Sequence, residues 1–106
     1  MRILFDQGTP VPLRRYLSSQ TVATAYERGW SKVTNGDLIR FAEQAGDELL
    51  ITTDMNLRYQ QNLRGRSLAI LVLTTTSWPR IRQAAEPIVA AIKEIEEGSY
   101  LELIIP

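Results

Sequence analysis

The stretch from Leu68 to Leu73 reads Leu-Ala-Ile-Leu-Val-Leu, an apolar run without any polar interruption. Buried strands of parallel sheets have this pattern, because helices cover both faces of such sheets. Shorter strand patterns are predicted at residues 3–5, 21–25, 49–53 and 100–105, with helical patterns between most of them. The alternation predicts an α/β fold, a three-layer sandwich with a mostly parallel sheet of four to five strands, forming one domain over residues 1–106.

Three shorter helices are expected between the strands. One begins near Pro12 and carries apolar residues at helical spacing up to Leu17. Asn35 is expected to cap a second helix, which Gly46 ends. Asp54 is expected to cap a third, polar helix through residue 65.

The longest helix is expected over Pro79 to Glu97. Pro87 lies inside this range, and a proline inside a helix costs about 3 kcal/mol, so a kink or break is expected near Glu86. Gly98 ends the helix, and Glu102 in the strand that follows predicts an exposed face or an edge position.

The chain contains neither histidine nor cysteine. It therefore lacks a histidine general base, a cysteine nucleophile and the soft ligands of structural zinc sites. Carboxylate chemistry remains, and a convergent set of carboxylates favours a hard cation such as Mg²⁺ or Mn²⁺.

Composition predicts a globular protein of the cytoplasm that does not act on a membrane. Apolar residues make up 44% of the chain and charged residues 23%. No apolar run is long enough to span a bilayer, and the amino terminus lacks the pattern of a secretory signal. The net charge is zero, but ten of the twelve basic residues are arginine, which favours a local surface for phosphate-bearing partners.

Asp6, Asp37 and Asp54 are the candidate site residues. Asp6 and Asp54 follow predicted strands, and Asp37 lies in the first turn of a predicted helix. In a parallel sheet, strand carboxyl ends and helix amino ends share one edge, where ligands bind. We therefore expect the three carboxylates to face one rim, where a divalent cation would offset their mutual repulsion.

Each aspartate also has a plain structural explanation. Asp6 would start a turn, Asp37 would complement a helix dipole, and Asp54 would cap a helix. These explanations do not account for three aspartates on one edge, so a shared cation site is the favoured hypothesis.

Several segments resemble a short bacterial PIN-like family related to VapC-type toxins. They are residues 3–6, residues 35–38, residues 50–54 and the segment from Asn56 to Leu63. The resemblance covers almost the whole chain, and its most specific parts are Thr52-Thr53-Asp54 and the segment that follows. It implies an α/β sandwich that cuts single-stranded RNA with Mg²⁺ or Mn²⁺, often as a toxin paired with an antitoxin protein.

By this resemblance Asp6, Asp37 and Asp54 would be catalytic residues and metal ligands, and Asn56 would be a further ligand. Related sequences often carry an acid where this chain has Gln7 and another where it has Asn56. Amide oxygens still bind metals, but the site has less negative charge.

RNA contacts would come from basic and aromatic side chains. The arginines would hold the phosphate backbone and an aromatic ring would stack on a base; the candidates are Arg14, Arg15, Arg58, Arg64 and Arg66, with Tyr59 or Trp30. Taken singly, each arginine is better explained as a solvated side chain of a helix or loop. Thr52 and Thr53 would orient water or Asp54, although threonine is also common at strand ends.

Two alternatives to a nuclease remain. The first is a non-catalytic PIN-like binding module, and residues 100–105 would then offer a strand for pairing with another chain, including a homodimer. The second is a phosphoacceptor receiver-like domain, matched loosely by Asp6, Asp54 and Thr74. A receiver needs a lysine after its fifth strand, and none follows residue 93.

Overall fold

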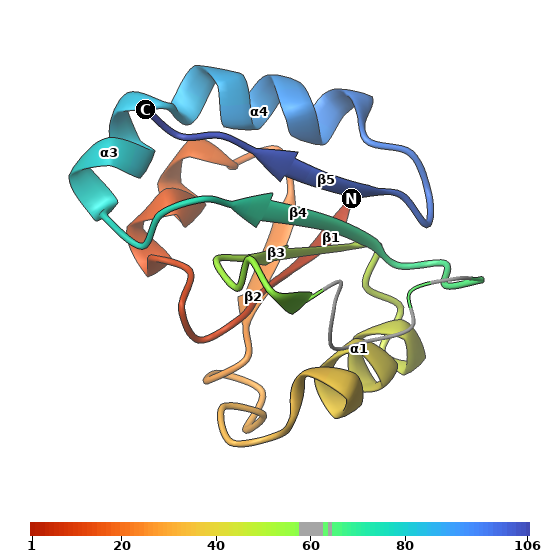
Figure 1. Ribbon diagram of the computed structural model, residues 1–106. Helices are drawn as coiled ribbons and strands as arrows, with labels where there is room; N and C mark the ends of the chain where they lie inside the picture. Colours follow the sequence, from red (N-terminus) through yellow and green to blue (C-terminus); the bar gives the residue numbers. More distant parts are fainter. Residues whose placement is uncertain (58–62, 64) are drawn as a thin grey trace.

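The computed structural model describes residues 1–57, 63 and 65–106, and its centre is one five-stranded sheet (Figure 1). The strands are β1 (Arg2–Phe5), β2 (Thr21–Thr24), β3 (Leu49–Thr52), β4 (Ala69–Leu73) and β5 (Tyr100–Leu103). Their order is β2-β1-β3-β4-β5, and every neighbouring pair is parallel. The predicted α/β class and parallel sheet are confirmed.

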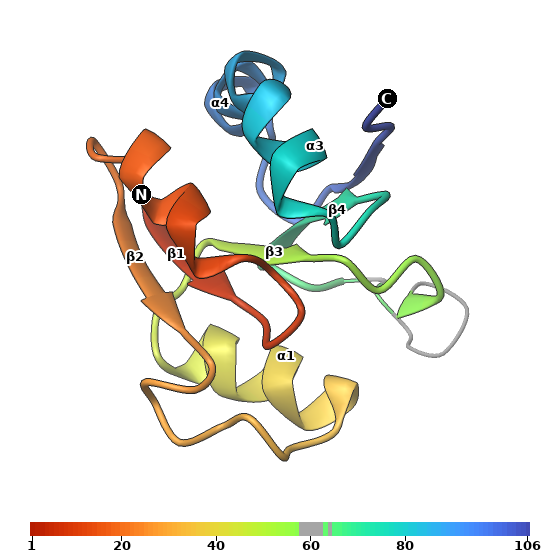
Figure 2. The same ribbon diagram turned by 90° about the vertical axis from the view of Figure 1, so that its left-hand side faces the viewer.

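Helices lie on both faces of the sheet, as Figure 2 shows. The helix α1 (Asn35–Gln44) covers one face. The opposite face carries the 3₁₀ helix η1 (Val11–Tyr16) and the two helices α3 (Trp78–Gln83) and α4 (Ala85–Glu94). Because all strands run in one direction, their carboxyl ends meet at a single edge of the sheet.

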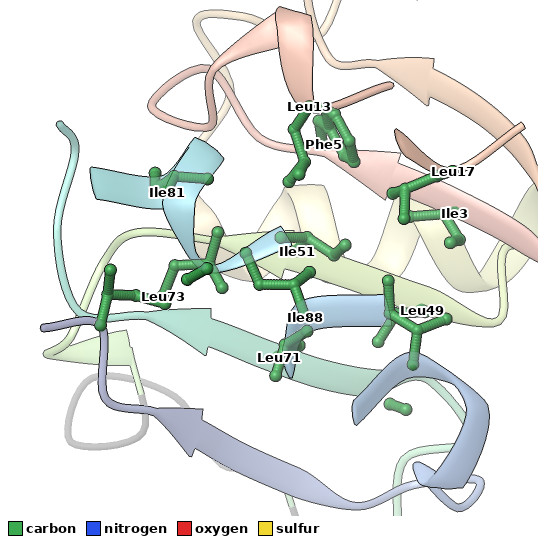
Figure 3. Close-up of a cluster of buried hydrophobic side chains, with 14 residues drawn as sticks. Ile3, Phe5, Leu13, Leu17, Leu49, Ile51, Leu71, Leu73, Ile81 and Ile88 are labelled. Atoms are coloured by element: carbon green, nitrogen blue, oxygen red, sulfur yellow. The ribbon is translucent and has the colours of Figure 1, made fainter. Parts of the chain in front are cut away.

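The sheet has an apolar core on each face. Ile3 and Phe5 point to the side of α3 and α4, while Leu4 between them points to the side of α1. Figure 3 shows the first of these cores, in which Ile81 of α3 and Ile88 of α4 pack with strand residues that are almost fully buried. This double-sided burial explains why β4 is apolar throughout.

The long helix expected over Pro79 to Glu97 is two helices, so the predicted break is confirmed; it lies at Ala84, two residues before Glu86. Pro87 lies in the first turn of α4, where the missing N–H group costs no hydrogen bond. Pro87 therefore fits near the start of the second helix instead of kinking one long helix. The second helix ends at Glu94, short of the predicted end.

Smaller differences concern helix ends. The N-cap of α1 is Thr34, whose side chain accepts a hydrogen bond from the N–H of Asp37, so Asn35 is the first helical residue and not the cap. Gly46 follows α1 with a positive φ of 84°, as the predicted stop requires. The predicted polar helix after Asp54 falls largely on residues 58–62 and 64, which lie outside the described residues.

The last strand, β5, is an edge strand, as predicted, and its Glu102 is exposed. Among the described residues, no helix combines the length and apolar character needed to cross a bilayer.

Candidate functional site

Asp6 directly follows β1 at the carboxyl edge of the sheet, and its carboxylate is held by neutral donors. The hydroxyl of Thr52, at the end of β3, donates to Asp6 Oδ2. The hydroxyl of Thr9 lies 2.7 Å from Asp6 Oδ1, and backbone N–H groups of Thr9 and Gly8 also donate to the carboxylate. No basic side chain of the described residues forms an ion pair with it.

Burial raises the pKa of Asp6 above its ordinary value, because a desolvated carboxylate loses its favourable hydration. The hydrogen bonds from Thr52, Thr9 and Gly8 lower the pKa and offset only part of this effect. The ionised form of Asp6 is therefore incompletely compensated by its surroundings. A cation next to this carboxylate would supply the missing compensation.

Thr9 has two acceptors for one hydroxyl proton. Its Oγ1 lies 2.7 Å from Asp6 Oδ1 and 2.8 Å from the carbonyl oxygen of Ile51. A hydroxyl donates only one hydrogen bond at a time. Thr9 can thus turn its proton to Ile51 without losing a hydrogen bond, which removes one of the donors to Asp6 Oδ1.

Gly8 allows the turn after Asp6 to lie directly against the end of β3. A Cβ atom at this position would be 2.6 Å from Oγ1 of Thr53, closer than side-chain atoms normally approach. Glycine removes this clash. The close approach keeps the turn packed over the two threonines at the end of β3.

Thr52 connects Asp6 to Asp54. While its hydroxyl donates to Asp6, its Oγ1 accepts a hydrogen bond of 3.0 Å from the backbone N–H of Asp54. The carboxylate of Asp54 accepts from Asn35 Nδ2 at 2.8 Å and from the backbone N–H of Asn56 at 2.9 Å. One polar network thereby joins the ends of β1 and β3 to the first residue of α1.

The carboxylate of Asp37 contacts a different group from those that bind Asp6 and Asp54. Its Oδ1 accepts a hydrogen bond of 2.6 Å from Arg40 on the next turn of α1, and both side chains are largely exposed. Within the described ranges, no three acidic side chains are grouped so that they could hold a metal ion. The network joins two of the three predicted aspartates, and a ligand role for Asp37 stays a prediction.

The other predicted contact residues are mostly engaged elsewhere. Arg14 forms a two-pronged ion pair with Glu27, with N–O distances of 2.6 and 3.1 Å. Trp30 is partly buried next to Phe41, and the Arg28 guanidinium lies 5.2 Å from the centroid of its ring. Arg15 is exposed, while Arg58, Tyr59 and Arg64 lie outside the described residues.

Thr74 is also engaged, because its Oγ1 accepts a hydrogen bond of 2.8 Å from the N–H of Ile105. Gln7 and Asn56, the two positions that depart from the acidic pattern, are both exposed. Asn56 reaches the network through its backbone N–H.

Two acids at the opposite edge of the sheet have arginine partners. Asp47, just before β3, has a fully buried side chain that binds both terminal nitrogens of Arg28. Glu43 of α1 accepts from Arg66 at 2.9 Å and from the backbone N–H of Ser67 at 3.0 Å. These pairs are structural, since the chain itself neutralises each buried charge.

Asn35 and Thr9 are site residues that the sequence pattern did not identify. Asn35 was expected as a helix cap and as part of a segment that resembles the PIN-like family, and Thr9 was not singled out. The position of Thr9 three residues after Asp6, inside a turn, is the spacing at which a side chain folds back onto an aspartate. Comparisons with models of protein families, with curated proteins and with solved structures find no match for this chain.

Proposed function

We propose that this protein is a metal-dependent ribonuclease of the PIN-like type that acts on single-stranded RNA. The observation that carries the proposal is the pair of acids at the carboxyl edge, Asp6 and Asp54. Among the described residues, both accept hydrogen bonds from neutral donors only, whereas the acids Asp47 and Glu43 at the opposite edge are neutralised by arginine. Carboxylates at a ligand-binding edge that lack a cationic partner suit a cation from solution.

The residues present fit Mg²⁺ or Mn²⁺. All potential ligands are hard oxygen atoms, from Asp6, Asp54 and the amides of Asn35 and Asn56. Magnesium is commonly held by one or two carboxylates, with water and substrate phosphate completing the shell. Two carboxylates are therefore enough, and Thr9 can withdraw one of the donors to Asp6 Oδ1 by turning to Ile51.

When bound, the cation would activate water for attack on a phosphodiester and stabilise charge on the phosphate oxygens. The residues of the chain would hold the metal ligands in position. Thr52 fixes Asp6 relative to the backbone of Asp54, and Asn35 fixes the Asp54 carboxylate relative to α1. Among the predicted contact arginines that the structure describes, Arg14 and Arg66 pair with acids, so the exposed Arg15 is the candidate for contacting the RNA backbone. Pairing with an antitoxin protein is part of the proposal as the implied regulation.

A binding module without cleavage is the second candidate. It is favoured by the oxygens of Asp54, each of which already accepts a hydrogen bond, and by the lower charge that Gln7 and Asn56 give the site. In this case the site would bind a cation weakly and serve recognition.

The test measures Mn²⁺ binding by calorimetry and cleavage of a mixed pool of single-stranded RNA with Mn²⁺. Wild type should bind the ion and cut RNA, while Asp6→Asn and Asp54→Asn should each reduce cleavage at least about a hundredfold and weaken ion binding. Glu94→Gln, an exposed acid on α4, is the matched control and should behave as wild type. Ion binding without cleavage would select the binding module, and absence of ion binding would overturn both candidates.

A further inference from the structure

A groove runs along the outer side of α4, where this helix meets the end of η1. Its volume is about 410 Å³. The floor is apolar or small, and two charges complete the lining, which consists of Tyr16, Ala85, Glu86, Val89, Ala90 and Lys93. Tyr16 is 43% exposed although its ring packs against Trp78 at a centroid distance of 6.1 Å. The groove is therefore an apolar surface with a partly uncovered aromatic ring.

The two charges lie at opposite ends of the groove. Glu86, Val89, Ala90 and Lys93 share one face of α4, since they are spaced by three, four and seven residues. Glu86 and Lys93 are two turns apart, about 10 Å along the helix. Neither side chain has an ion pair or hydrogen bond within the part of the chain that the structure describes.

This pattern is complementary to itself in the antiparallel direction. If a second α4 packs antiparallel across a two-fold axis midway between Val89 and Ala90, Glu86 of each copy faces Lys93 of the other. Val89 then faces Ala90, whose small side chain allows the two helix axes to approach closely. A two-fold contact repeats each interaction, so one face satisfies both charges of both copies.

We propose that this groove is the contact face of a homodimer in which the α4 helices of two copies pack antiparallel. The balanced charges favour a second copy over a strongly acidic or basic partner, because either of those would leave one charge opposed by its own sign. The contact is small, so the dimer forms and dissociates with protein concentration. This inference does not depend on the proposed nuclease activity.

A charge-exchange experiment tests the proposal by sedimentation velocity over a wide concentration series. Wild type should dimerise, and Glu86→Lys and Lys93→Glu should each weaken self-association at least about tenfold, because like charges then face each other. An equimolar mixture of the two variants should form a heterodimer with near wild-type affinity, since every facing pair is again opposite in sign. The double variant Glu86→Lys/Lys93→Glu should also self-associate.

The matched control is Glu94→Lys, which makes the same change of charge on the same helix outside the groove. It should dimerise as wild type does, and circular dichroism should show all variants folded. A wild type that stays monomeric throughout, a mixture that does not associate, or equal weakening by Glu94→Lys overturns the proposal. Dimerisation that survives both single variants also overturns it and assigns the contact to another surface, such as the exposed edge of β5.

Discussion

Asp47 and Glu43 at one edge of the sheet differ from Asp6 and Asp54 at the other edge in the groups that bind their carboxylates. At the amino edge, Asp47 is fully buried and bound by Arg28, and Glu43 is bound by Arg66. At the carboxyl edge, Asp6 and Asp54 accept hydrogen bonds from hydroxyl, amide and backbone N–H groups. Both edges contain acids in partly or fully buried positions, but among the described residues Asp6 and Asp54 have no arginine partner. The exposed acids near the carboxyl edge differ, since Asp37 pairs with Arg40 and Glu27 pairs with Arg14.

The difference separates stability from function. The charge of a buried acid is balanced when an arginine binds both of its oxygens. Removing that arginine destabilises the protein, because the buried charge is then uncompensated. A desolvated acid with neutral donors is left with a charge that the fold does not balance. The same residue type is therefore structural at one edge and available for a ligand at the other.

The largest effect is expected at the amino edge. Arg28→Met should lower the free energy of unfolding by about 3 kcal/mol, because the buried Asp47 carboxylate then keeps only Arg2, whose Nη2 lies 4.0 Å from Asp47 Oδ1. Urea denaturation monitored by circular dichroism measures this difference. The double variant Arg28→Met/Asp47→Leu should recover much of the loss, since no charge is then buried. Similar stability of the single and double variants would show that the charge of Asp47 is not what Arg28 offsets.

A smaller change in the free energy of unfolding is expected when Glu43 is replaced. Burial would raise its pKa, but hydrogen bonds from Arg66, Leu68 and Ser67 outweigh burial and lower the pKa below the ordinary value. Glu43→Gln should cost about 1.5 kcal/mol at neutral pH, a value limited by partial exposure of the pair to water.

The pH dependence of this variant has a defined sign. An acid with a lowered folded pKa stabilises the protein above its ordinary pKa of 4.5, and that stability is lost as the pH falls through the lowered value. The difference between wild type and Glu43→Gln should therefore shrink in acid. A difference that stays constant from neutral pH to pH 3 would contradict an ionised Glu43 as the source.

At the carboxyl edge, removing the charge of an acid should stabilise the protein instead of destabilising it. Asp6→Asn should raise stability at neutral pH in the absence of divalent metal, because it removes a desolvated charge. The raised pKa of Asp6 means that wild-type stability is fully present below the ordinary value of 3.8 and declines as the pH rises through the folded pKa.

The advantage of Asp6→Asn should therefore disappear in strong acid. Thermal unfolding at several pH values, with and without Mn²⁺, measures both the pH dependence of stability and the stabilisation by the ion. Addition of Mn²⁺ should stabilise wild type and leave Asp6→Asn unchanged. Destabilisation by Asp6→Asn at every pH would show that Asp6 is a structural acid like Asp47, and the contrast between the edges would be lost.

The sequence predicted the sheet well because its strands differ from everything around them. The run at β4 and the strand-end positions of Asp6 and Asp54 follow from apolar patterning alone. The break was predicted to within two residues, but not whether Pro87 would kink one helix or lie in the first turn of a second, because proline fits both positions. The contacts of Asn35 and Thr9 depend on segments distant along the chain, which local patterns do not report.

The smallest effect is expected at Asp37, the aspartate that pairs with Arg40 instead of joining the network. Arg40→Gln should change the free energy of unfolding by less than about 0.5 kcal/mol, because the pair is exposed and water screens it. If Asp37 only complements the start of α1, its release should leave Mn²⁺ affinity within about twofold of wild type. A clear rise in Mn²⁺ affinity, abolished when Asp37→Asn is added, would instead make Asp37 a third ligand that Arg40 holds away from the ion. Calorimetric titration of the two variants therefore decides whether the carboxyl edge binds its cation with two acids or three.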